Sequence, residues 1–115
     1  SVIFSGVNTS NPFNVHGGNN GAGVTSLSTT VTTTAAPTTL IGFVAASTGG
    51  GITNDGSQTA IESNSNDNFS KSGARKDANT AGSNSLSWSF NSSQASGYMG
   101  ALLPAPSGGF FAATQ

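Results

Sequence analysis

The sequence predicts an all-β fold: an antiparallel, jelly-roll-like β-sandwich with about seven or eight short strands and little or no helix. Three observations support this prediction. In Ser85–Phe90, large apolar residues alternate strictly with serine, which is the two-residue period of a half-buried strand. Val24–Thr34 is rich in β-branched residues, and turns of Gly, Asn and Ser separate such segments. No segment shows the 3.6-residue apolar period of a helix.

The N-terminal part is expected to contain two strands joined by a loop. Val2–Val7 predicts the first short strand. Asn8–Gly23 is predicted as a polar loop, because it contains a proline, paired glycines and an Asn-Gly turn signal. Phe13 and Val15 are expected to pack this loop onto the sheet. Val24–Thr34 is the second strand, since β-branched residues suit a pleated surface.

The middle of the chain contains its only continuous apolar run, within Thr39–Ala46. An apolar run of this length without alternation favours a central strand that is covered on both faces. Three glycines, Gly49–Gly51, then end the strand. Two weaker strands are expected over Thr59–Ser63 and Phe69–Ala78, with polar connections between them.

The segment Asn84–Pro106 predicts a pair of antiparallel strands with one buried and one wet face. Its alternation places Trp88 on the same face as Leu86 and Phe90, which favours a core position for the indole ring. A polar break follows at Asn91–Gln94, and the apolar pattern then resumes.

The chain is expected to divide into a β-sandwich domain over residues 1–106 and a tail over residues 107–115. Two glycines, Gly108 and Gly109, separate Phe110 and Phe111 from the domain. The tail could form an edge strand of its own domain, or it could insert into a neighbouring subunit by strand addition. Phe110 and Phe111 are therefore candidate assembly residues.

The composition limits the classes of partner. Only 6% of the 115 residues are charged, the net charge is −1, and there is no cysteine. Three basic residues are too few for a nucleic-acid surface, and no apolar run reaches the length of a membrane span. A weakly charged surface offers little repulsion to neighbouring subunits, which favours a homo-oligomer or other virion or filament subunits as partners. A secreted domain solvated by hydroxyl groups remains an alternative.

The titratable residues do not suggest an enzyme. His16 is the only histidine, and it lies in a Gly- and Asn-rich segment without a neighbouring carboxylate. The chain has four carboxylates: Asp55, Glu62, Asp67 and Asp77. Their spacing does not indicate an acid–base pair, and Ser63–Asn68 is better interpreted as a polar turn than as a calcium loop. No catalytic residue, cofactor or metal ligand is predicted.

Two groups of residues are candidates for contact with a glycan or a protein partner. Lys71 and Arg75 share one face of a predicted strand and form a small basic patch, although an edge strand protected by charge is the preferred explanation. Tyr98 is the best candidate for an exposed aromatic residue. Trp88, Tyr98 and His16 could form a platform on which a sugar stacks if they are exposed, although core packing is preferred for Trp88.

The placed strands resemble a family of small, jelly-roll-like β-sandwich modules of phage virion proteins and bacterial exported proteins. The resemblance rests on the opening Val2–Asn8 with Pro12-Phe13, on Thr39–Ala45 after the Thr-rich strand, and on Leu86–Phe90 with the apolar segment that ends at Ala105. It covers most of residues 1–106 and excludes the tail. It implies a head-fibre, decoration, tail-appendage or adhesion module without catalytic residues.

The leading hypothesis is a non-enzymatic, extracellular or virion-surface structural module, such as a phage decoration or fibre protein or a surface-filament subunit. The alternative is a carbohydrate-binding or adhesion module that recognises a cell-surface glycan. Neither hypothesis involves a nucleic acid or a membrane as partner.

Overall fold

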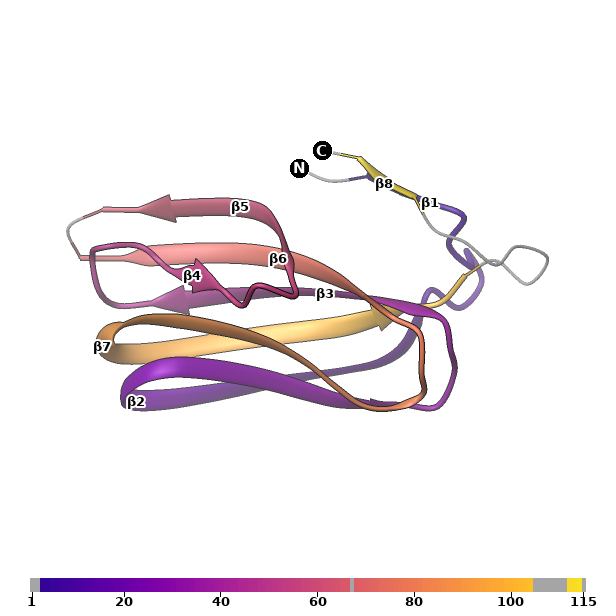
Figure 1. The fold of residues 1–115 in the computed structure, drawn as a ribbon, viewed down its shortest axis with the longest axis horizontal. Coiled ribbons are helices and arrows are strands. Elements are labelled where there is room, and N and C mark those ends of the chain that lie inside the picture. Colours follow the sequence, from indigo (N-terminus) through magenta and orange to yellow (C-terminus); the bar gives the residue numbers. More distant parts are fainter. Residues whose placement is uncertain (1–2, 67, 105–111, 115) are drawn as a thin grey trace.

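The computed structural model describes residues 3–66, 68–104 and 112–114, and these residues form an all-β, antiparallel fold (Figure 1). The strands are β1 (Ile3–Ser5), β2 (Phe13–Thr33), β3 (Thr38–Ala46), β4 (Thr53–Asn54), β5 (Thr59–Ser65), β6 (Ser70–Ala78), β7 (Gly82–Leu102) and β8 (Ala112–Thr114). Among the described residues there is no helix, and so none that could cross a bilayer. The predicted all-β, antiparallel class is confirmed.

The main sheet is open and has six strands. Its order is β2-β7-β3-β6-β5, and the short strand β4 pairs with β7 beside this path. Strands β2 and β7 are each 21 residues long and pair along almost their whole length, from Phe13 opposite Leu102 to Thr33 opposite Gly82. Two strands of the sheet are therefore far longer than the sequence predicted.

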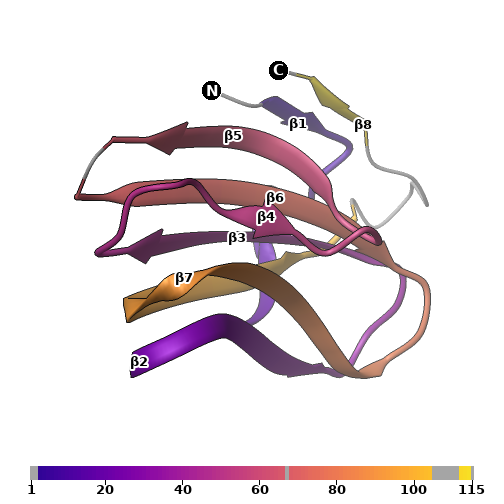
Figure 2. The ribbon, with the colours of Figure 1, turned by 60° about the vertical axis from the view of Figure 1, so that its left-hand side comes forward.

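The paired strands β2 and β7 turn back together near their middle, so each strand has two halves that run in opposite directions (Figures 1 and 2). The pairing register shifts on either side of Val24, which marks a β-bulge, and bulges sharpen the bend of a strand. Next to it, Gly23 has a φ of 64°, a conformation that favours glycine. The bend therefore has a local cause in the sequence.

Side-chain hydrogen bonds join the two halves of β2. The Asn19 amide nitrogen donates to the Ser28 carbonyl oxygen at 2.9 Å. The Asn14 side chain donates to Thr34 Oγ1 and accepts from the Thr34 backbone nitrogen, both at 2.9 Å. Because these residues are 9 and 20 positions apart in the chain, the halves of β2 must face each other.

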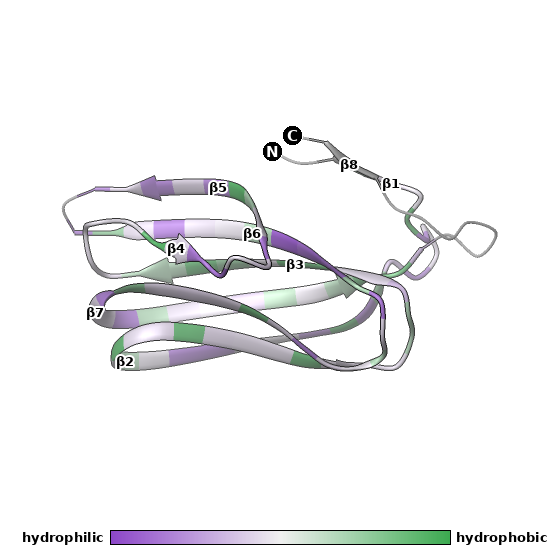
Figure 3. Ribbon diagram, viewed as in Figure 1, coloured by the Kyte–Doolittle hydropathy of each residue, from purple (hydrophilic) through white to green (hydrophobic). Residues whose placement is uncertain are grey.

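The core lies between the facing halves. Leu27, Leu86 and Trp88 point inward from one side, where the side chains of Leu86 and Trp88 are 0% and 2% exposed. They meet small residues on the other side. A Cβ atom on Gly42 would lie 2.7 Å from Leu86 Cδ1, and one on Gly97 would lie 3.1 Å from Leu27 Cδ2. Figure 3 shows that hydrophobic residues are spread over many strands, as this packing requires. The predicted core position of Trp88 is confirmed.

Two predictions about the long strands are wrong. The predicted loop Asn8–Gly23 lies largely in strand β2, because residues 13–21 form backbone pairs with residues 95–102 of β7. The prediction failed because Gly and Asn, which dominate this segment, have low strand propensity. The two strands predicted within Asn84–Pro106 are halves of the single strand β7, and they are bonded to other strands instead of to each other.

Two predictions about the middle of the sheet need a similar correction. Strand β3 is central, between β7 and β6, but only one of its faces is covered: Leu40 and Val44 are buried, while Phe43 is 47% exposed. Strand β6, which carries Lys71 and Arg75, is an inner strand and not an edge strand, because β5 pairs with its outer side. The strands predicted over Thr59–Ser63 and Phe69–Ala78 are otherwise confirmed as β5 and β6.

The two ends of the chain meet in a separate two-stranded ribbon. Strand β8 pairs antiparallel with β1, with Ile3 opposite Thr114 (Figure 1). The chain next to this ribbon is tied to the main sheet by the Asn8 nitrogen, which donates to the Leu103 oxygen at 3.0 Å, and by a bridge between Val7 and Pro104. Phe110 and Phe111 lie outside the described residues.

Candidate functional site

Four large apolar side chains are exposed on the surface of the main sheet that points away from the core. They are Phe13, Phe43, Phe69 and Tyr98, with exposed fractions between 45% and 55%, and we call this surface the aromatic face. Phe43 and Tyr98 alternate along β3 and β7 with buried neighbours such as Val44 and Met99. The two-residue period that fills the core therefore also places these rings outside.

Three of the four rings lie over glycines of neighbouring strands. A Cβ atom on Gly100 would lie 2.8 Å from the Phe13 ring, and one on Gly18 would lie 2.7 Å from the Tyr98 ring. A Cβ atom on Gly73 would lie 2.5 Å from the Phe43 ring. Aromatic residues often cover a cross-strand glycine in this way.

The edges of these rings therefore occupy space that a side chain on each glycine would fill. Register explains why they meet the glycines. One continuous row crosses five strands of the sheet: Gly18, Tyr98, Phe43, Gly73 and Glu62. Residues directly opposite each other in neighbouring strands are in side-chain contact distance. The aromatic pair at the centre of the row is thus flanked by a glycine on each side.

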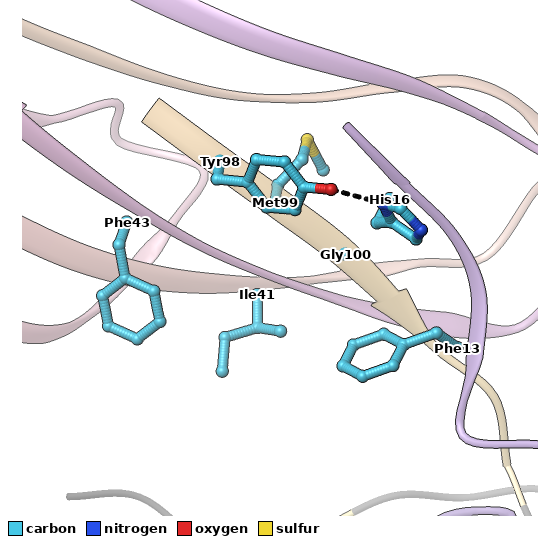
Figure 4. A pocket seen from close by; sticks show the side chains of 7 residues that line it. All are labelled: Phe13, His16, Ile41, Phe43, Tyr98, Met99 and Gly100. Atoms are coloured by element: carbon cyan, nitrogen blue, oxygen red, sulfur yellow. Dashed lines mark hydrogen bonds between the residues drawn. The ribbon is translucent and has the colours of Figure 1, made fainter. Parts of the chain in front are cut away.

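His16 and Tyr98 form a joined pair at one border of the aromatic face. His16 Nδ1 and the Tyr98 hydroxyl are hydrogen-bonded, and the two rings are stacked with centroids 5.8 Å apart and planes at 29° (Figure 4). The sequence suggested both residues for a sugar platform, and the structure brings them together. Trp88 lies in the core and takes no part.

Three shallow hollows lie on the aromatic face. The first, of about 410 Å³, is lined by Phe13, Ile41 and Phe43, which project on the same side, together with His16 and Tyr98 (Figure 4). The second, of about 330 Å³, has Phe43, Phe69 and Tyr98 in its lining. The third, of about 510 Å³, is lined by Phe69, by three alanines and by four polar residues. Ligand pockets commonly have volumes of about 300–1,000 Å³.

The charges next to the aromatic face nearly cancel. Lys71 forms an ion pair with Glu62 of the neighbouring strand at 3.7 Å, and both side chains are about half exposed. Arg75 is half-buried, four residues from Lys71 along β6, and its Nε atom has no hydrogen-bond partner among the described residues. Asp77, next to it on the same face, accepts a hydrogen bond from Thr39 Oγ1 at 3.1 Å. The predicted basic patch is therefore balanced by two carboxylates.

The arrangement is suited to binding by stacking and hydrogen bonding. Within residues 3–66, 68–104 and 112–114, no three His, Asp or Glu side chains gather into a group that could hold a metal ion. Sequence reasoning missed Phe13, Phe43 and Phe69 as surface residues. The glycines opposite them carry the relevant signal, but this signal can be recognised only once the strand register is known.

Comparisons with protein-family models, with curated proteins and with solved structures found no significant match to this chain. The resemblance to phage and exported jelly-roll modules therefore stays a prediction.

Proposed function

We propose that this chain is a non-enzymatic, extracellular adhesion module that binds a cell-surface glycan on its aromatic face. The observation that carries the proposal is the placement of Phe13, Phe43 and Tyr98 over Gly100, Gly73 and Gly18. Each of these rings lies beside a backbone position without a side chain, and each residue is 46–55% exposed, so aromatic surface is open to solvent.

Sugar rings suit such a surface. One face of a pyranose ring carries C–H bonds with small positive partial charges, and the face of an aromatic ring is negative. Polar groups at the border can then fix the orientation of the sugar through its hydroxyl groups. The hydrogen-bonded pair His16 and Tyr98 supplies such groups beside the first hollow.

We further propose that the folded β2–β7 ribbon makes the chain a jelly-roll-like β-sandwich, as the sequence suggested. The support is the packing of each strand half against the other. A Cβ atom on Gly17 would lie 3.4 Å from Val31 Cγ1, and Asn19 bonds to Ser28 across the same gap. A long ribbon that folds back with its apolar side inward is the construction principle of such a sandwich.

A structural subunit of a virion or a surface filament is the second candidate. It is favoured by the four exposed rings together with the low charge, because exposed apolar patches also mark protein–protein contacts. The sequence alone favoured this candidate. The hollows lined by these rings, with the hydrogen-bonding pair His16 and Tyr98 beside the first, move the preference to a glycan, since small-molecule sites combine apolar lining with a few polar groups.

A pair of substitutions at Phe43 separates the two candidates. Phe43→Leu keeps an apolar side chain over Gly73 but removes the aromatic surface, and Phe43→Ala removes both. We expect both variants to lose most of the signal on a glycan array while the melting temperature stays close to that of the wild type. Thr30→Ala, at an exposed site on the other half of β2, is the control and should bind normally.

The opposite pattern would support the structural subunit. In that case the wild type would show no glycan signal and would self-associate in light scattering. Phe43→Leu would keep most of this self-association and Phe43→Ala would lose it, because a protein contact at this site depends on apolar area more than on aromatic character.

A further inference from the structure

The three hollows of the aromatic face form one continuous series. The first and second share Phe43 and Tyr98 in their linings. The second and third share Phe69, Ala45 and Ser96. A ligand that fills one hollow can therefore continue into the next without leaving the surface.

The series follows the direction of the strands. Arg75 of β6 is opposite Ile41, which lines the first hollow; Gly73 is opposite Phe43; and Lys71 is opposite Ala45. Phe69 directly precedes β6, six residues from Arg75. At about 3.3 Å per residue, the series covers roughly 20 Å. Such a length fits several sugar units in a chain better than a single sugar.

The surroundings of the series favour an uncharged ligand. Lys71 and Glu62 neutralise each other in the lining of the second hollow. Arg75 has Asp77 beside it on the same face of β6. An acidic ligand would therefore be attracted by Arg75 and repelled by Asp77. Neither sign of ligand charge would meet a complementary surface.

The third hollow provides hydrogen-bonding groups instead of charges. Its lining includes four residues with amide or hydroxyl side chains: Asn20, Ser47, Gln94 and Ser96. Such groups match the hydroxyls of a neutral sugar, and Phe69 at the same place provides a further ring. Both ends of the series thus combine an aromatic ring with polar groups.

We propose that the aromatic face binds a linear, uncharged glycan chain that lies along the strands, with one end at Phe13 and His16 and the other end at Phe69. The inference rests on the proposed glycan binding and adds the ligand class, the direction of the chain and a second subsite at Phe69.

Neutral oligosaccharides of increasing length test this proposal. The probes are cello-, chito-, manno- and malto-oligosaccharides from the disaccharide to the hexasaccharide, measured by calorimetry against wild type, Phe69→Ala and Phe69→Leu. We expect the affinity for one series to rise with chain length. Both Phe69 variants should weaken the hexasaccharide by roughly five- to tenfold and leave the disaccharide unchanged, because only the longer chain reaches the second subsite.

The outcomes separate the inference from the proposed function. If affinity does not change with length, or if Phe69→Ala weakens the disaccharide as much as the hexasaccharide, the extended chain is wrong while glycan binding stands. If oligogalacturonates bind more tightly than every neutral series and salt weakens them, the uncharged ligand class is wrong. If the folded wild type binds no glycan in either set, the proposed function itself fails. Thr30→Ala serves as the control throughout.

Discussion

The ring of Phe43 covers Gly73 of the neighbouring strand so closely that a Cβ atom on Gly73 would lie 2.5 Å from the ring. The contact lies on the exposed side of the sheet, where Phe43 is 47% exposed. A ring in this position can move aside into solvent, whereas a core side chain cannot. The orientation of the ring therefore depends on the absence of a side chain at position 73.

Gly73→Ala is expected to separate binding from stability. The new methyl group should displace the Phe43 ring and reduce glycan binding as strongly as Phe43→Ala. The free energy of unfolding should change by less than about 1 kcal/mol, since the gain from replacing a strand glycine offsets the lost contact. Urea unfolding and calorimetry measure the two effects. Gly56→Ala, where a Cβ atom would meet nothing within 4 Å, is the control. Unchanged glycan binding by Gly73→Ala would contradict the role of this contact.

Gly42→Ala should have the opposite effect, because its Cβ atom would point into the core. There it would lie 2.7 Å from Leu86 Cδ1, 3.0 Å from the Tyr98 carbonyl oxygen and 3.1 Å from Met99 Cβ. Backbone and buried side chains cannot move aside at low cost, so overpacking should destabilise the fold by about 1–3 kcal/mol. Urea unfolding should show a lower midpoint. A stability equal to that of Gly73→Ala would mean that the two faces of the sheet are packed alike.

The apolar alternation in the sequence was enough to find the all-β class and most strands. Ser85–Phe90 keeps a strict two-residue period because one side of this half of β7 faces the core. Residues 13–23 have no such period, since Gly and Asn dominate them. Their extended conformation depends on pairing with the far half of β7, and this tertiary contact leaves no local pattern.

The aromatic face could not be predicted from the sequence for a related reason. An uninterrupted apolar run such as Leu40–Ala46 looks the same whether its second face is buried or forms a binding surface. The sequence therefore predicted a buried position for Phe43. Tyr98 and His16 were predicted as candidates for a sugar platform, but their hydrogen-bonded pairing becomes visible only once the register of β2 against β7 is known.

Trp88 provides a fluorescence test of the core, because it is the only tryptophan. At 2% exposure its emission should be blue-shifted and poorly quenched by acrylamide, and glycan binding on the other face of the sheet should leave it unchanged. Trp88→Ala should destabilise the fold by about 3–5 kcal/mol. Trp88→Phe should cost much less, since it also removes an indole N–H that has no hydrogen-bond partner in the described part of the chain. A large emission change on saturation with glycan would place the ligand elsewhere.

The amides of Asn14 and Asn19 test whether the folded ribbon is held together at its edge. Asn19 bridges the two halves of β2 and Asn14 bonds to Thr34, directly after the second half, so Asn19→Ala should reduce the free energy of unfolding by about 0.5–1.5 kcal/mol. The double variant Asn14→Ala/Asn19→Ala should lose more and should also aggregate, because β2 is an edge strand of the sheet and would no longer be tied to its own second half. Urea unfolding and light scattering measure these two effects. Asn11→Ala, an exposed asparagine outside the strands, is the control. If the double variant stays monomeric and as stable as this control, the bridging amides do not hold the two halves together.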